Sequence, residues 1–208
     1  MSGEDDAAGL GSVYDLTDAE AARRHYDAWA ARYDDDLAKA EYATPARAAR
    51  MLVEAGADPA GALADFGCGT GLSGEAFAAA GFGVIDGFDI SPASLDLARA
   101  KGVYRALVEC DLGRPLPVED GAYANAAAVG VLAAALMPVD TLDRMLATLE
   151  PGGRLVFSLN DHHRADGLIE GRLMELTDCG AARLLAREHG VHLPTLGIEA
   201  TLYVLQRP

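Results

Sequence analysis

The residues most able to bind a ligand lie in one short glycine-rich stretch. Residues 61–66 are mostly small and apolar and include Asp65, and Gly67, Gly69 and Gly71 then alternate before an alanine-rich segment. This order predicts a buried strand, a tight turn and the start of a helix. Glycine permits a positive φ and a close approach of a ligand to the main chain, and a helix start presents free N–H groups. The stretch is therefore expected to bind a molecule with a polar or anionic end.

Two ligands fit this stretch by pattern. Residues 69–74 satisfy Gly-x-Gly-x-x-Gly, the dinucleotide fingerprint, and Asp89 lies 20 residues after Gly69. The other register, Asp-x-Gly-x-Gly-x-Gly, runs from Asp65 to Gly71 and resembles the first motif of the class I S-adenosylmethionine-dependent methyltransferases. In that family the glycine loop passes under the methionine part of S-adenosylmethionine, and an acid on the next strand holds the ribose hydroxyls.

The acid near the end of the next predicted strand matches this second requirement. The largely apolar run 83–90 predicts a strand, and Asp89 near its carboxyl end would face the crevice where open parallel sheets bind ligands. A carboxylate there can accept two hydrogen bonds from a vicinal diol. The helix that Pro92 opens already has Ser91 to cap it. Asp89 is therefore expected to hold the ribose, whereas Asp86 is expected to be an exposed strand residue.

A further acid follows the third predicted strand, which spans residues 105–110. Asp111 and Leu112 resemble the family's adenine-binding pair, in which the acid accepts from the adenine amino group and the apolar side chain packs on the ring. Asp111 could instead be a turn residue, because Gly113 lies two positions on. Together with the main chain at the end of the fourth strand, the resemblance implies cofactor contacts from Asp65, Gly67, Cys68, Gly69, Gly71, Asp89, Ile90, Asp111, Leu112 and Val129.

The chain before the glycine-rich stretch predicts two helices. The first starts near Asp18 and carries Tyr26, Trp29 and Tyr33 at spacings of three and four residues, so one of its faces is aromatic. Such a stripe is most often part of a core. In the methyltransferases that the chain resembles, a similar tyrosine segment covers the cofactor, so Tyr33 is expected to contact the cofactor and Tyr26 and Trp29 to line the acceptor side. The second helix spans residues 44–54.

Strands and helices alternate through the rest of the chain, which is typical of α/β proteins. The expected strands are 61–66, 83–90, 105–110, 123–129, 154–160, 182–188 and 198–205, with 190–197 as a connection, and the later helices are 73–80, 92–101, 139–149 and 167–178. The resemblance implies a Rossmann-like, seven-stranded, mostly parallel sheet with helices on both faces and an antiparallel last strand. Residues 14–208 are expected to form one domain, with 14–56 as a helical lid segment and 1–13 as a flexible tail.

Two histidines follow the fifth predicted strand. His162 and His163 lie at the same edge of the predicted sheet as the glycine loop, but neighbouring side chains diverge along regular backbone. One of them could act as a general base, or both could be exposed loop residues. No further ligands lie nearby at metal-binding spacing, so no metal is expected.

The composition limits the classes of partner. The chain has 208 residues with 17 Lys and Arg against 32 Asp and Glu, a net charge of −15, which argues against a nucleic-acid backbone and favours a small-molecule substrate. No apolar run approaches the ~20 residues of a membrane span. The acidic start is unlike a signal peptide, and three cysteines without metal-type pairing fit a reducing cytoplasm.

The motifs together predict methyl transfer. Tyr-Asp-x-Trp-Ala-x-x-Tyr-Asp at 26–34 and Leu-Gly-x-Pro-Leu-Pro at 112–117 are similar to the methyltransferase-like proteins of the Williams–Beuren region type. The resemblance implies S-adenosylmethionine as methyl donor, S-adenosylhomocysteine as product, and an O, N or S nucleophile on an unidentified acceptor. Two alternatives stay open. One is an NAD(P)-binding oxidoreductase, although the chain has no Tyr-x-x-x-Lys pair of the short-chain type, and the other is a non-catalytic S-adenosylmethionine-binding protein.

Overall fold

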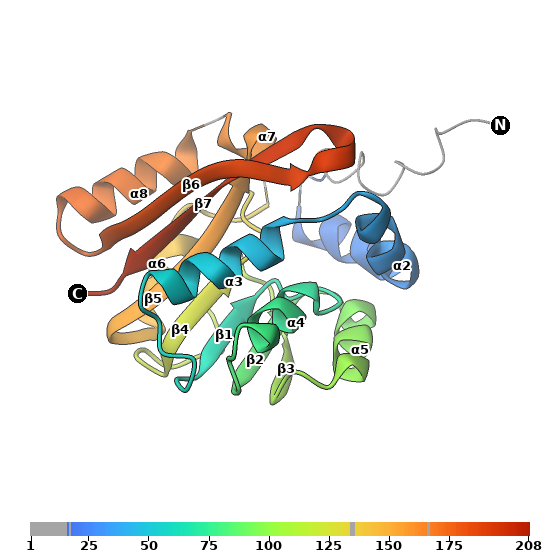
Figure 1. The fold of residues 1–208 in the computed structure, drawn as a ribbon, viewed down its shortest axis with the longest axis horizontal. Helices are drawn as coiled ribbons and strands as arrows, with labels where there is room; N and C mark the ends of the chain where they lie inside the picture. The colour runs from blue at the N-terminus through green and yellow to red at the C-terminus, as the bar shows by residue number, and fades with distance from the viewer. Residues whose placement is uncertain (1–15, 17, 134–135, 166) are drawn as a thin grey trace.

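The computed structural model describes residues 16, 18–133, 136–165 and 167–208, so the tail expected at residues 1–13 lies outside the described residues. The described strands form one seven-stranded sheet in the order β3-β2-β1-β4-β5-β7-β6 (Figure 1). The strands are β1 (Leu63–Phe66), β2 (Ile85–Asp89), β3 (Ala106–Glu109), β4 (Tyr123–Ala128), β5 (Leu149–Asn160), β6 (Arg183–Leu193) and β7 (Ile198–Gln206).

The strand directions confirm the predicted sheet. β1 pairs in parallel with β2 and β4, β2 with β3, and β4 with β5. β7 runs antiparallel to both of its neighbours, β5 and β6. Every residue of β1 is buried, as expected for a central parallel strand that is covered on both faces.

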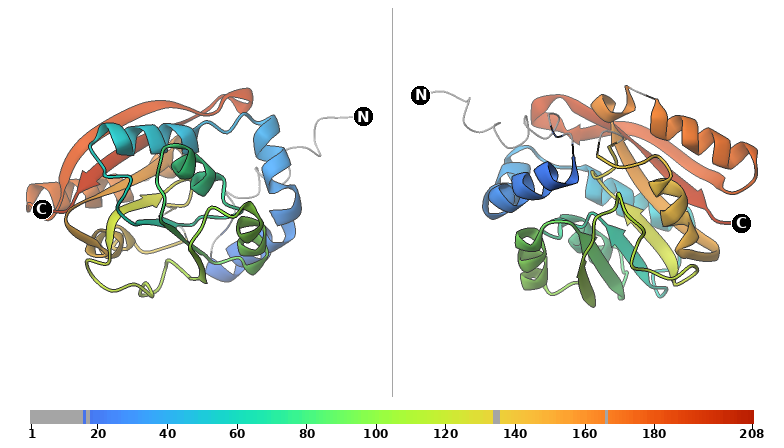
Figure 2. Two further views of the ribbon diagram at one scale, coloured as in Figure 1. Left: turned by 60° about the horizontal axis from the view of Figure 1, so that its bottom comes forward. Right: turned by 180° about the vertical axis from the view of Figure 1, so that it is seen from behind.

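Helices cover both faces of the sheet (Figures 1 and 2). α3 (Thr44–Glu54) and α4 (Leu72–Ala79) pack on one face, where Leu52 and Phe77 meet Leu63. α6 (Thr141–Ala147) and α8 (Leu168–Asp178) pack on the other face, where Met145 and Leu173 share a core with Phe66. The remaining helices with a part in the site are α2 (Ala19–Lys39), α5 (Pro92–Lys101) and α7 (Asp161–Arg164).

Three predictions about the helices and strands are wrong. The helix expected to reach residue 149 ends at Ala147, because Leu149 already pairs with Tyr123 as the first residue of β5. Residues 161–164 form the short helix α7 rather than a loop. β6 continues to Leu193, so the first half of the expected connection at 190–197 is strand, and the turn is the short 3-10 helix η2 (Pro194–Leu196).

The expectation that Asp86 is exposed is also wrong. Its side chain is 6% exposed and accepts hydrogen bonds from Arg105 Nε at 2.9 Å and from the Tyr123 hydroxyl at 2.7 Å. Burial opposes its ionisation, but the two hydrogen bonds outweigh burial and lower the pKa of Asp86. Asp86 therefore joins β2, β3 and β4 as a buried anion.

The strand order creates a crevice at one end of the sheet. The chain proceeds outward from β1 through β2 to β3, and then in the other direction from β4 to β5. Ligands bind outside the carboxyl ends of strands at such a switch point. Figure 1 shows α2 at the opposite end of the molecule from the C-terminus. Within the described residues, no helix has the length and apolar character needed to cross a membrane.

The packing of Gly74 yields a stability prediction. A Cβ at Gly74 in α4 would lie 2.3 Å from the Tyr104 hydroxyl oxygen, whereas a Cβ at Gly171 in α8 meets nothing within 4 Å. We expect Gly74→Ala to lower the free energy of unfolding by about 1–3 kcal/mol through overpacking. The matched variant Gly171→Ala should raise it by about 0.5–1 kcal/mol through helix propensity. Urea unfolding measures both, and equal effects would contradict the packing of Tyr104 against α4.

Candidate functional site

A pocket opens at the carboxyl ends of β1 to β4 and is covered by α2. Its wall contains eight of the predicted cofactor residues and the predicted acceptor residue Tyr26. The predicted residues that line it are Tyr26, Tyr33, Gly67, Gly69, Asp89, Ile90, Asp111, Leu112 and Val129. Gly130, whose main chain follows the predicted Val129 at the end of the fourth strand, also lines it. The residues that the sequence reasoning missed are Ala19, Ala22, Thr70, Ser94, Cys110, Gly113, Val131, Leu136 and Met137. Thr70, Cys110 and Gly113 directly adjoin a predicted residue, so for these three the position beside a strand end was the available signal.

The loop after β1 has a shape that needs glycine. Gly67 and Gly69 adopt φ values of +72° and +53°, which side chains rarely adopt. A Cβ at Gly67 would lie 2.4 Å from Val131, whereas nothing lies within 4 Å of the place for a Cβ at Gly69. The Gly67 N–H donates to the Phe88 carbonyl at 2.7 Å, which fixes the loop against β2. The main chain at Gly69 is therefore open to the pocket.

Asp89 joins two of the loops that form the pocket. Its Oδ2 accepts from the Gly69 N–H at 2.8 Å, and its Oδ1 accepts from the Ser91 N–H at 2.9 Å. Burial raises the pKa of Asp89, while these two backbone hydrogen bonds act in the opposite direction. Each carboxylate oxygen retains lone-pair capacity for a further donor. Asp89 can thus shape the site and still bind a ligand.

Asp65 lies beneath the pocket rather than in its wall. It is fully buried, and its Oδ2 accepts from the hydroxyls of Ser73 at 2.7 Å and Tyr104 at 2.8 Å. Among the described residues, its Oδ1 has no hydrogen-bond partner. Burial raises the pKa of Asp65 to about 6. A buried carboxylate oxygen without a donor is costly, so this atom suits a ligand that brings a positive charge.

The other predicted loop residues do not line the pocket. The Cys68 side chain is 3% exposed and its sulfur lies 2.8 Å from where a Cβ of Gly87 would stand, so it packs into the sheet. Gly71 caps α4 with a φ of +98°.

Asp111 combines both roles that the sequence suggested for it. It lines the pocket, and it is also a turn residue, since its Oδ1 accepts from the Gly113 N–H at 2.8 Å.

Polar contacts attach α2 to the loops of the pocket. Thr70 in the glycine loop donates its hydroxyl proton to Asp34, which also pairs with the Lys101 ammonium at 2.8 Å. Ser91 donates its hydroxyl proton to Asp27 at 2.6 Å. Tyr26 and Tyr33 project from the same helix into the pocket wall. α2 is therefore held over the pocket by side chains of the pocket's own loops.

A second pocket adjoins the first. The two share Tyr26, Tyr33 and Gly130. The lining residues of the second pocket are Tyr26, Trp29, Tyr33, Leu37, Tyr42, Gly130, Asn160, His163, His192 and Leu193. Trp29 is 3% exposed and donates from Nε1 to Asp36 at 2.8 Å. The aromatic stripe of α2 thus serves both as core and as pocket wall.

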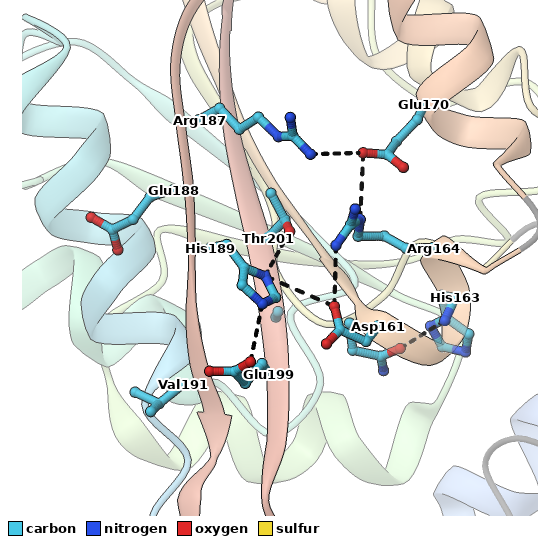
Figure 3. A network of polar contacts seen from close by, with 12 residues as sticks. Asp161, His163, Arg164, Glu170, Arg187, Glu188, His189, Val191, Glu199 and Thr201 are labelled. Atoms are coloured by element: carbon cyan, nitrogen blue, oxygen red, sulfur yellow. Dashed lines mark hydrogen bonds and ion pairs between the residues drawn. The ribbon is translucent and has the colours of Figure 1, made fainter.

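Of the two histidines after β5, only His163 lines the second pocket. α7, which contains both histidines, also joins an exposed polar network with the β6–β7 hairpin (Figure 3). There Asp161, His189 and Glu199 each bring one potential metal-ligand atom within 4.8 Å of the others, a combination that sequence spacing did not reveal. Arg164 pairs with Asp161 at 3.2 Å and supplies a positive charge at this place.

Comparison with known proteins shows which proteins this chain resembles. Residues 64–157 match the family model of the methyltransferase domain. The human methyltransferase-like protein 27 is 34% identical over 145 residues, which cover 68% of this chain and 59% of the human protein. The chain therefore spans about three-fifths of the length of that relative.

Solved structures confirm the fold. An S-adenosylmethionine-dependent methyltransferase from Mesorhizobium loti superimposes with a TM-score of 0.63 at 19% identity, over 81% of this chain and 100% of that chain. A TehB-like S-adenosylmethionine-dependent methyltransferase from Corynebacterium glutamicum gives 0.63 at 20% identity, over 89% and 99%. A chain of the complex between the Haloferax volcanii Trm112 methyltransferase activator and a methyltransferase gives 0.66 at 20% identity, over 86% and 96%.

The contacts of Asp34 predict how firmly α2 is held. Asp34→Ala removes the hydrogen bond from Thr70 and the ion pair with Lys101. We expect amide hydrogen exchange in α2 to quicken by about tenfold, since a hydrogen bond to a charged group contributes about 1.5–3 kcal/mol before solvent screening. Asp35→Ala changes the charge equally at an exposed neighbour and should leave exchange unchanged. Equal exchange in both variants would contradict this attachment.

Proposed function

We propose that this chain, which carries a methyltransferase domain of the class I S-adenosylmethionine-dependent family, transfers a methyl group to an O, N or S nucleophile of a small-molecule acceptor. One observation carries the proposal. The ends of β1, β2, β3 and β4 converge on one pocket, and Asp89 in its wall joins the loops after β1 and β2. The three cysteines, Cys68, Cys110 and Cys179, are free, which supports a reducing, cytoplasmic setting as part of the proposal.

The side chains around the pocket suit the parts of S-adenosylmethionine. Asp89 would accept from the ribose hydroxyls, and Asp111 with Leu112 would hold the adenine. The open main chain at Gly69 would lie beside the methionine part. Asp65 Oδ1, which lacks a donor among the described residues, would attract the amino group of the methionine part directly or through water. The last assignment rests on the buried position and raised pKa of Asp65.

The chain's contribution to the reaction would be alignment and exclusion of water. S-adenosylmethionine supplies a methyl carbon that its sulfonium already activates, so the acceptor mainly needs an in-line position. α2 would act as the lid of the predicted 14–56 segment, because its Tyr26 and Tyr33 line the pocket and also line the second pocket beside it. A strong general base is needed only for an acceptor that is protonated at working pH.

The packing of the fingerprint glycines favours this function over a dinucleotide oxidoreductase. In the dinucleotide register, Gly71 and Gly74 would lie close to a pyrophosphate or to the neighbouring strand. Neither residue lines the pocket. Tyr104 fills the place beside both glycines, since it lies 3.1 Å from a Cβ at Gly71 and 2.3 Å from one at Gly74.

Calorimetric titration tests the cofactor class. We expect the purified protein to bind S-adenosylhomocysteine with a micromolar dissociation constant, and NAD not to bind under the same conditions. Binding of NAD alone would overturn the proposal. Binding of S-adenosylhomocysteine without turnover in a broad acceptor screen would indicate a binding protein rather than an enzyme.

An Asp89→Ala variant tests the ribose assignment in the same titration. We expect affinity for S-adenosylhomocysteine to fall by ~1–3 kcal/mol, because charge-assisted hydrogen bonds are lost. Asp96→Ala removes an exposed carboxylate of α5 that pairs with Arg99, and this variant should bind S-adenosylhomocysteine with unchanged affinity. Unchanged affinity in a folded Asp89→Ala protein would refute the role of Asp89.

The raised pKa of Asp65 predicts a pH dependence of binding. The free protein takes up a proton on Asp65 below about pH 6, whereas a bound amino group favours the carboxylate. Affinity for S-adenosylhomocysteine should therefore be constant above that pH and fall about tenfold per unit below it. The surrounding groups are the hydroxyls of Ser73 and Tyr104 and the carboxylate of Asp89. In Asp65→Asn, calorimetry should show weaker binding of S-adenosylhomocysteine and no change in pH dependence near pH 6. If the variant shows the same pH dependence as the unaltered protein, Asp65 is not its source.

A further inference from the structure

The second pocket has a lining without ionic side chains. Among the described residues that form it, none is Asp, Glu, Lys or Arg. It adjoins the proposed cofactor pocket at Tyr26, Tyr33 and Gly130. A molecule in the second pocket would therefore lie next to the cofactor, in a lining that has no carboxylate, Lys or Arg side chain.

Aromatic rings form much of its wall. Trp29 and Tyr33 meet edge to face with ring centroids 4.7 Å apart, and Tyr26 stacks with Trp29 at 6.3 Å. The Tyr42 ring meets His192 at 5.2 Å, nearly perpendicular. Because Trp29 Nε1 is already bound to Asp36, its indole offers apolar surface. Rings at such angles suit a flat aromatic guest.

His192 supplies a fixed polar group in this wall. Its side chain is 7% exposed, and its Nδ1 shares a hydrogen bond of 2.7 Å with the Thr44 hydroxyl. Its carbonyl accepts from the Ala43 N–H at 3.0 Å, which ties β6 to the start of α3. Within the described part of the chain, Nε2 of His192 has no hydrogen-bond partner. Nε2 is therefore the atom that His192 can offer to a molecule in the pocket.

The charges around His192 disfavour an ionic guest. Burial, together with the positive charges of Arg47 and His163, lowers the pKa of His192 to about 4, so the imidazole is neutral near pH 7. Arg47 donates to the carbonyl of the adjacent Val191 at 2.7 Å and also pairs with Glu188 at 3.0 Å. Its positive charge, which disfavours protonation of His192, also opposes a cationic guest. The described lining has no Lys or Arg side chain to pair with an anion. An unpaired buried charge is costly.

We propose that the second pocket is the acceptor site and that it takes an uncharged aromatic molecule whose hydroxyl or ring nitrogen is held by Nε2 of His192. This inference rests on the proposed methyl transfer, because the adjoining pocket must hold the methyl donor. It makes His192 a specificity residue, and it assigns Tyr26 and Trp29 to the walls around the guest.

The single tryptophan gives a direct readout. Trp29 is the only tryptophan of the chain and lies in the wall of the second pocket. Its fluorescence is titrated with 4-methylphenol, benzylammonium and benzoate in protein saturated with S-adenosylhomocysteine. We expect saturable quenching by 4-methylphenol, at least about tenfold tighter than by either ion. Equal affinities for the neutral and the ionic probes would overturn the proposal.

Variants of His192 test its role. His192→Phe retains a ring of similar size but no nitrogen, and we expect 4-methylphenol to bind about tenfold more weakly. Thr44→Val removes the hydrogen bond that positions the imidazole of His192 and should also lower the affinity for 4-methylphenol. His189→Ala alters a histidine of the same strand that does not line the pocket and should bind the phenol normally. Unchanged phenol affinity in His192→Phe would refute the assignment.

S-adenosylhomocysteine binding separates the two proposals. If the unaltered protein binds no S-adenosylhomocysteine, the proposed function itself fails. If it binds S-adenosylhomocysteine but not 4-methylphenol, only the acceptor site fails. Each His192 and Thr44 variant is first shown to keep its affinity for S-adenosylhomocysteine, so a misfolded protein is not mistaken for a loss of specificity.

Discussion

The pocket depends on the hydrogen bonds between the Asp89 carboxylate and two backbone N–H groups. Parallel pairing of β1 with β2, with Phe66 opposite Phe88, brings the loop after β1 beside the end of β2. Asp89 then accepts from Gly69 and Ser91 and holds both loops in place. A neutral residue could not accept both bonds with comparable strength. The cost of burying this charge, visible in its raised pKa, is offset by donors that the fold itself supplies.

Local signals made most of the fold predictable. The turn after β1 and the acid at the end of β2 are set by residues close in sequence, so glycine, serine and proline positions were enough to place them. Asp86 shows where such reasoning fails. Its partners are Arg105, directly before β3, and Tyr123, the first residue of β4, and only the lateral order of strands brings them together. An ion pair between segments that are distant in sequence leaves no periodic pattern.

The second pocket could not be predicted from the sequence for a related reason. Gly190 indicated a turn, but it lies within β6 because the Arg47 guanidinium occupies the space beside it, 3.1 Å from where a Cβ would stand. The strand therefore continues and carries His192 to the start of α3, where Thr44 binds it. Glycine marks a close approach as readily as a turn. Without the partner helix in view, the sequence could not distinguish the two roles.

α2 is both a part of the hydrophobic core and a cover of the pocket. Its Trp29 and Leu37 are buried like core residues, but the polar bonds of Asp27 and Asp34 go to Ser91 and Thr70 in the pocket loops. Opening α2 would therefore loosen the loops that bind the cofactor, and a cofactor that orders those loops would favour the closed helix. Such reciprocity follows from linkage. Because α2 also forms walls of both pockets, the donor and the acceptor would be coupled through a single helix.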